Sequence, residues 1–119
     1  MTAPNIVSVV TITGKTNAIT GIGTSSAELV ANAASSNNVL KVNAVILGNV
    51  YGNDTTATVE LRRGGVDYSL VQAIDVPNKS TLDVLNKPLY LEEGDSLRVT
   101  AGHAAALEAI CSYELLTDQ

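Results

Sequence analysis

The sequence predicts an all-β protein: a single antiparallel β-sandwich, or jelly-roll-like domain, with an extended N-terminal arm. Apolar and polar residues alternate at a period of two through most of the 119 residues, which is the pattern of half-buried strands. Turn-forming residues recur roughly every ten positions, a spacing typical of sandwiches and jelly rolls. The length is that of one domain.

The N-terminal part divides into an arm and a linker. Residues 6–13, IVSVVTIT, are rich in β-branched side chains, which favour extended backbone. Residues 14–26, GKTNAITGIGTSS, are small, polar and glycine-bearing, as linkers often are. We therefore predict an arm and linker over residues 1–26 and a β-sandwich domain over residues 27–119.

The segment 24–38 permits two interpretations. Ser25 followed by Glu28 has the pattern of a helix capping box, and the alanines and leucine nearby also favour a helix. Such a helix would have only about two turns, which is marginal without packing. A strand over residues 27–32, turned back by AASSNN, fits its neighbours better, and a short helix is the alternative.

Alternation predicts the remaining strands. They lie at residues 39–50, 55–62, 68–76, 95–101 and 107–116, with a short pair or one interrupted strand between residues 80 and 91. Gly64 and Gly65 predict a tight hairpin, because glycine readily takes the positive φ that such turns need. In the strand at 39–50, one face is expected to carry Leu40, Val42, Ala44 and Ile46. In the strand at 107–116, one face is expected to carry Leu107, Ala109, Cys111, Tyr113 and Leu115.

Composition limits the classes of function. Apolar residues make up 45% and charged residues 16% of the chain, so it is expected to fold. With no Phe or Trp, its core must rely on aliphatic side chains, and part of its stability is expected to come from neighbouring molecules. The net charge is −5 and the largest basic cluster is Arg62 with Arg63, which argues against nucleic acid and anionic membranes as partners.

The single cysteine, Cys111, permits neither an internal disulfide nor a zinc site with a second cysteine. The apolar runs are too short to cross a bilayer, and the start, MTAPNIV, lacks the regions of a signal peptide. We expect a soluble protein made in a reducing cytoplasm.

Candidate catalytic residues are few. His103 lies in an expected hairpin loop without a recognisable partner motif, and Cys111 lies on the apolar face of its strand. TGKT at 13–16 and GIGTSS at 21–26 only partly match phosphate-binding and dinucleotide-binding patterns. We expect no enzymatic activity, no cofactor and no metal site.

The stretch LYLEEGDSLRVTA places Glu92, Glu93 and Asp95 around Gly94. These carboxylates could bind a cation, form part of an acid pair, or belong to an exposed turn between strands. Calcium sites need more oxygen ligands in an alternating loop, and no second acidic cluster is near. We predict a turn in which Gly94 has positive φ and Asp95 bonds to the backbone.

In order along the chain, VILGN (45–49), TATVELR (56–62), LEEGDSLRV (91–99) and LEAICSYE (107–114) resemble a pattern in small structural proteins of tailed bacteriophages. The resemblance covers residues 27–116. It implies a virion β-sandwich that acts in assembly, as a capsid decoration (cement) protein or as a tail, neck or baseplate component. The implied partners are further copies of the chain, with a trimer as one candidate, and the major capsid protein.

The β-branched arm suits strand addition to a neighbouring copy. The expected interface residues are Ile6, Val7, Val9, Val10 and Ile12. A different class of function is a carbohydrate-binding β-sandwich, although such sites normally present exposed aromatic platforms and the chain has only four tyrosines.

Overall fold

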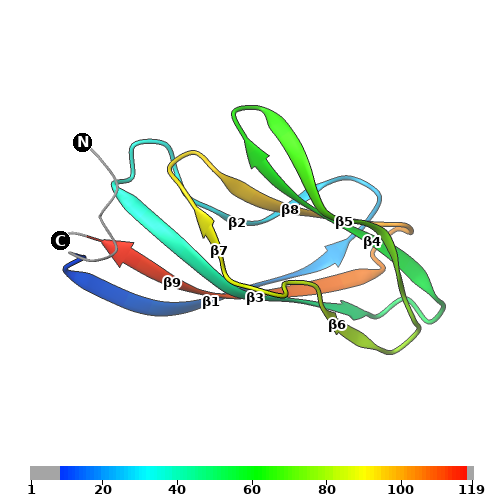
Figure 1. The fold of residues 1–119 in the computed structure, drawn as a ribbon. Coiled ribbons are helices and arrows are strands. Elements are labelled where there is room, and N and C mark those ends of the chain that lie inside the picture. Colours follow the sequence, from blue (N-terminus) through cyan, green and yellow to red (C-terminus); the bar gives the residue numbers. More distant parts are fainter. Residues whose placement is uncertain (1–8, 118–119) are drawn as a thin grey trace.

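The protein, seen here in a computed structural model that describes residues 9–117, is built from two antiparallel sheets packed face to face (Figure 1). Its strands, in chain order, are β1 (Thr11–Ile22), β2 (Ala27–Ala31), β3 (Asn38–Asn49), β4 (Thr55–Arg63), β5 (Val66–Val76), β6 (Thr81–Asp83), β7 (Leu89–Leu91), β8 (Ser96–Ala101) and β9 (Leu107–Thr117). The body is elongated, 47 × 26 × 21 Å.

The strand order is that of a jelly roll. The first sheet has the order β1-β9-β3-β6, with β7 also pairing with β3, and the second has the order β2-β8-β4-β5. Because β6 and β7 pair with successive parts of β3, they act as one interrupted strand and give eight strands in two four-stranded layers. The predicted all-β sandwich is confirmed. The strand predicted over residues 27–32 is also confirmed, as β2, and the helical alternative for this segment is wrong.

Strand β1 corrects the predicted linker. Its residues pair with β9 from Thr11 opposite Thr117 to Ile22 opposite Leu107, with one irregularity between Ile19 and Ile22. The residues 14–22 therefore belong to the sandwich, although their composition resembles a linker. Most β1 side chains are exposed, and an edge strand with little cover does not need an apolar inner face. Residues 6–8 of the predicted arm strand lie outside the described range.

A bulge in β3 corrects the predicted face of that strand. The pairing with β9 shifts by one position between Val42 and Ala44, so Asn43 is an extra residue. Beyond it the alternation reverses, and the buried side chains are Val45 and Leu47 in place of the expected Ala44 and Ile46.

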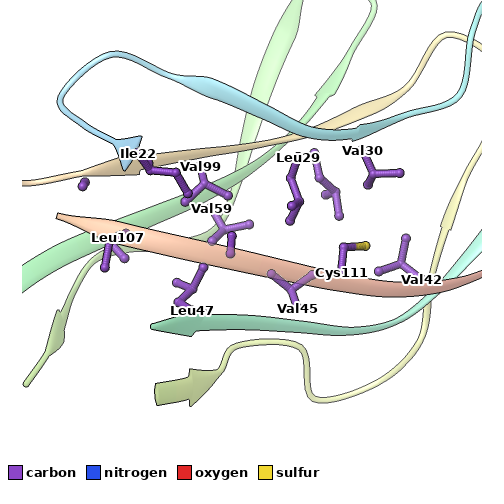
Figure 2. Packing of buried hydrophobic residues seen from close by; sticks show 14 of the residues in the cluster. Ile22, Leu29, Val30, Val42, Val45, Leu47, Val59, Val99, Leu107 and Cys111 are labelled. Carbon is purple, nitrogen blue, oxygen red and sulfur yellow. The ribbon is translucent and has the colours of Figure 1, made fainter. Parts of the chain in front are cut away.

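The core lies between the two sheets and is almost entirely aliphatic (Figure 2). Its largest fully buried side chains are Ile22, Leu47, Leu91, Leu97, Leu107, Val42, Val45, Val59, Val76, Val99 and Cys111. Burying one such side chain stabilises a fold by about 1.5–3 kcal/mol. The expected inward face of β9 is confirmed: Leu107, Ala109, Cys111 and Tyr113 are buried and Leu115 is partly buried. Alternate residues of β4 and β8 are buried in the same way.

Two buried asparagines connect the layers. Asn32, which follows β2, and Asn49, at the end of β3, each donate two hydrogen bonds from Nδ2 to main-chain carbonyls. One bond in each pair spans a long stretch of sequence, from Asn32 to Leu91 O (3.0 Å) and from Asn49 to Val76 O (2.8 Å). The bonds to Leu91 O and Val76 O are buried, so they satisfy main-chain carbonyls that are away from water.

Candidate functional site: an assembly surface on strand β1

The acidic turn between β7 and β8 is a structural element. Gly94 has φ +88° as predicted, and Asp95 Oδ2 accepts a hydrogen bond from Glu92 N (2.8 Å). Asp95 is 2% exposed, which corrects the expectation that the acidic turn is exposed throughout. Its carboxylate accepts two hydrogen bonds from Arg63, at the end of β4, and these bonds raise the pKa of Arg63.

The rest of this turn is also held by protein atoms. Glu93 Oε2 accepts a hydrogen bond from Asn37 N (2.9 Å), and Glu92 lies near Arg63 with its side chain largely exposed. Gly94 N donates to Asn32 O (2.7 Å). The carboxylates therefore fasten the turn to the two sheets. Among residues 9–117, no group of three His, Cys, Asp or Glu is placed to hold a metal ion.

Cys111 points into the core from β9 (Figure 2). Burial raises the pKa of its thiol to about 11, because the charged thiolate loses its hydration in an apolar surrounding. A thiol with this pKa is protonated near neutral pH. Only the deprotonated thiolate is a good nucleophile, so Cys111 is unreactive there. Cys111 acts as a small hydrophobic residue, as its place in the sequence pattern predicts.

His103 lies in the β8–β9 loop, as expected from the sequence, and its ring stacks on Tyr51 of the β3–β4 connection. The ring centroids are 3.9 Å apart with an interplanar angle of 21°. The ring atom Nδ1 lies 3.2 Å from Ala104 O. This pairing joins two loops at one end of the sandwich and was not visible in the sequence, because the two residues are far apart along the chain.

The predicted interface residues lie at and before the start of β1. Val10 is 69% exposed and Ile12 is 58% exposed, whereas Val9 is half-buried. Val10 N donates to Thr117 O (3.1 Å), which holds this part of the chain beside the end of β9. Ile6 and Val7 lie outside the described residues. The structure thus leaves two large apolar side chains in solvent at this end.

An apolar row continues from Ile12 across the outer face of the first sheet, the face turned away from the second sheet. Alternation along β9 directs Leu116 outward, and the pairing places it between Ile12 of β1 and Val39 of β3. Neither Leu116 nor Val39 belongs to the core cluster. The row of Ile12, Leu116 and Val39 is therefore an apolar feature apart from the core cluster, and within it Ile12 is exposed whereas Leu116 and Val39 are buried.

Further along the same face, Ile110 is 43% exposed. It lines a depression together with Ala18 and Thr20 of β1 and Glu108 of β9. Thr20 Oγ1 donates to Glu108 Oε2 (3.1 Å) at its rim. The outer face of β1 and β9 thus combines exposed apolar side chains with a hollow and few charges.

The edge strands of the two sheets differ. On the second sheet, β5 carries two register shifts and a positive φ of 51° at Ala73, while β2 has five residues and one shift. On the first sheet, β6 and β7 have three residues each. Short, bulged or twisted edges resist pairing with other chains. By contrast, the register of β1 with β9 runs unbroken from Thr11 to Ile19, and β1 contains no proline and only one charge, Lys15.

Sequence reasoning found the apolar start of β1 but missed that β1 is an edge of the sandwich. Strand pairing is set by contacts between distant residues, so the sequence of β1 alone could not reveal it. The lack of charge through the segment gave no help, since an edge strand is usually blunted by charged side chains.

Within residues 9–117, no helix has the length and apolar character that a membrane span requires.

No family model and no curated protein matches the chain. Among solved structures, the chain is similar to a subunit from Bacillus endospore appendages, described as a novel family of disulfide-linked pili. The TM-score is 0.57 at 19% sequence identity, and the match covers 92% of this chain and 90% of the other. At this identity the likeness shows a shared fold, and it extends over nearly all of both chains.

Proposed function

We propose that the protein is a non-enzymatic structural subunit that assembles with further copies of itself. The observation that carries this proposal is the edge strand β1, which is long, regular and almost uncharged. Val10, just before it, and Ile12, near its start, have exposed side chains. Natural monomers usually avoid such an edge, because it offers a template for pairing with another chain.

The residues that could carry chemistry are engaged in structure, which supports a non-enzymatic role. Asp95 is held by Arg63, His103 is stacked on Tyr51, and the thiol of Cys111 is buried. Catalysis by any of them would need a partner group in hydrogen-bond reach and access for a substrate.

The fold likeness to a pilus subunit is compatible with assembly. The cysteine content of this chain, however, suggests a different kind of link between subunits. That neighbour comes from disulfide-linked pili. The present 119 residues contain one cysteine, which can join at most two chains and is buried in the core. A series of linked subunits would need at least two cysteines in each. Assembly of this chain is therefore proposed to be non-covalent.

At a finer level, the proposed role is capsid decoration in a tailed bacteriophage, with the virion as its location and the major capsid protein as its partner. The support is the resemblance of residues 27–116 to small virion proteins, together with the exposed β-branched start of β1. A tail, neck or baseplate component, or a pilus-like appendage subunit as in the structural neighbour, would use the same self-association.

Carbohydrate binding is less well supported. Tyr68 lies on β5 of the second sheet and Tyr90 on β7 of the first, so these two exposed rings do not form one platform. Tyr51 has His103 stacked on its ring. Specific binding on a glycan array would favour carbohydrate binding over a purely structural role.

The direct test is the mass of the purified protein as a function of concentration, followed by electron microscopy of any assembly. A chain that stays monomeric at millimolar concentration contradicts the proposed self-assembly. Undecorated phage capsids, offered to the full chain and to a chain without residues 1–8, then test the decoration role. Binding that is equal for both chains would remove the N-terminal segment from the interface.

A further inference from the structure

We infer that two copies of the chain pack face to face through the outer face of the first sheet, about a two-fold axis that runs parallel to the strands between β3 and β9. This inference rests on the proposed self-assembly and adds a surface to it, separate from the edge of β1. The occupant of the face is the same face of a second copy. Aligned sheets pack in this way with about 10 Å between them.

Two isoleucines lie side by side on this face. Ile110 of β9 is paired with Ile46 of β3, and on its other side it is paired with Ala18 of β1. Both isoleucines point away from the core, because their neighbours along each strand are buried between the sheets. The bulge at Asn43 is what turns Ile46 outward. The three side chains form an apolar band across three strands, in which Ile110 is 43% exposed.

The side chains next to this band are small, so a second sheet can approach closely. On one side of the band, Ser112 is paired with Ala44. On the other side, Gly48 is paired with Glu108, and the atom near the place of a Cβ on Gly48 is Thr81 Cγ2, at 3.7 Å. In the proposed packing, Glu108 of each copy would lie over Gly48 of the other, which keeps the two carboxylates apart.

The charges on this face suit a second copy. Lys41 of β3 and Glu114 of β9 are paired beyond Ser112, with 3.8 Å between Nζ and Oε1 and side chains 34% and 40% exposed. The proposed axis places β3 of one copy over β9 of the other, so each Lys41 would meet Glu114 of the second copy. Four charges would then alternate in sign, and such a network is stronger than one exposed pair. The same axis sets Ile46 of each copy against Ile110 of the other.

The direction of the axis follows from these positions. A two-fold axis across the strands at Ser112 would place β3 over β3 and β9 over β9, in opposite directions. Lys41 would then lie over Ile46 of the second copy, and Glu114 over Ile110. Charged groups would lose water without gaining a partner, which is costly. The axis parallel to the strands avoids this loss.

The outer face of the second sheet is less suited to a second copy. It carries the ion pairs of Arg98 with Glu28 and of Arg62 with Asp67. Covering ion pairs removes them from water, and their mutual attraction often fails to repay that cost. Because the whole chain has a net charge of −5, other approaches of two copies are mostly repulsive.

The size of the face predicts the strength of the contact. Four strands about 4.8 Å apart, over the eight residues 41–48 of β3, cover roughly 19 by 26 Å, or about 500 Å² in projection. Specific interfaces bury about 800 Å² on each partner. The pairing is therefore expected to be weak in dilute solution and to strengthen when many copies are held together in an assembly.

A charge exchange tests the contact between copies. Lys41→Glu and Glu114→Lys are each expected to weaken dimerisation about tenfold or more, because like charges meet across the axis. An equal mixture of the two variants is expected to form mixed dimers, in which opposite charges meet. This recovery cannot arise within one chain, since each variant lacks the internal ion pair. Sedimentation equilibrium at high protein concentration compares the three samples with wild type.

Arg62→Glu and Asp67→Lys are the matched controls on the second sheet. They change the net charge by the same amounts and break another ion pair between neighbouring strands. Alone or mixed, they are expected to leave dimerisation unchanged.

A substitution in the apolar band gives a second test. Ile110→Glu is expected to weaken dimerisation about tenfold or more. Val66→Glu, at a similarly exposed apolar residue on β5, is expected to have no effect. Thermal melts confirm that each variant is folded.

The failures of this inference and of the proposed function can be told apart. A wild-type chain that never associates contradicts both. If wild type associates, but Lys41→Glu, Glu114→Lys and Ile110→Glu associate equally well and the mixture shows no preference, only the contact through this face is contradicted. If wild type is monomeric and Ile110→Glu abolishes binding to undecorated capsids, the face belongs to a capsid subunit, which overturns a second copy as its occupant.

Discussion

Arg63 and Asp95 join the end of β4 to the β7–β8 turn through two hydrogen bonds, 2.9 Å from Nε to Oδ1 and 2.5 Å from Nη2 to Oδ2. The carboxylate is buried while the arginine side chain is 45% exposed. The pair therefore lies at the boundary between core and solvent, and its value to stability comes mainly from the hydrogen bonds that Asp95 accepts.

Replacing Asp95 by Ala is expected to lower the free energy of unfolding by about 2–3 kcal/mol. The substitution removes two charge-assisted hydrogen bonds and the bond from Glu92 N, and the exposure of Arg63 limits the loss. Urea denaturation measures it. The matched control is Glu92→Gln in the same turn. The side chain of Glu92 is 68% exposed, so this substitution is expected to change the free energy of unfolding by no more than about 0.5 kcal/mol. Equal losses from both substitutions would contradict the structural role of Asp95.

Replacing Gly94 by Val is expected to destabilise the protein by about 1–3 kcal/mol. At φ +88° a β-branched residue is strained even though no atom crowds its Cβ position. Gly48→Ala is the control, because that glycine has ordinary φ and only one contact, at 3.7 Å, in the place of a Cβ. Thermal unfolding compares them, and a Gly94→Val protein as stable as wild type would exclude strain at this turn.

Replacing Asn49 by Ala is expected to cost about 2–3 kcal/mol, since the carbonyls of Val76 and Asn53 lose their donor. The control Asn53→Ala retains that main-chain carbonyl and is expected to have little effect. Chemical denaturation of both variants provides the comparison. If Asn53→Ala were the more damaging change, the buried amide would not be the element that holds this end of the sandwich.

The stability of the protein is expected to fall as the pH rises from about 9 to about 11. The folded pKa of Cys111, about 11, lies above its ordinary value of 9.0, so the unfolded chain releases the proton first and unfolding becomes easier. The loss is roughly 2–3 kcal/mol, at about 1.4 kcal/mol per pH unit. Burial also raises the pKa of Tyr113.

Cys111→Ala isolates the contribution of the thiol. Its unfolding free energy, measured by denaturation between pH 8 and 11, is expected to have a shallower slope than that of wild type. A thiol reagent should react with wild type only on unfolding. Rapid reaction with the folded protein at neutral pH would show that the thiol is accessible.

The sequence was sufficient for the fold class because alternation acts locally: β4, β8 and β9 each bury the residues that a period of two selects. It was not sufficient where contacts with distant residues decide the outcome. Residues 14–22 look like a linker because an edge strand with few covering neighbours needs few apolar side chains. Asp95 looks like part of a solvated turn because its partner, Arg63, is 32 residues away.

The candidate assembly surface could likewise be predicted from the sequence only in part. The exposed β-branched residues Val10 and Ile12 were predicted as interface residues, and their exposure is seen in the structure. The apolar row that includes Leu116 and Val39 could not be predicted, because it depends on the pairing of three strands. The faces expected from alternation leave both residues on the opposite side of their strands, and nothing in the sequence places them beside Ile12.

The extra residue at Asn43 has a consequence for the evolution of this fold. A chain that loses Asn43 would reverse the faces of the rest of β3, turning Val45 and Leu47 toward solvent, unless another insertion compensates. Homologues are therefore expected to gain or lose residues here only together with changes along the same strand. An alignment to a chain without the bulge needs a one-residue gap at this position, or every later core position of β3 is compared with a surface position.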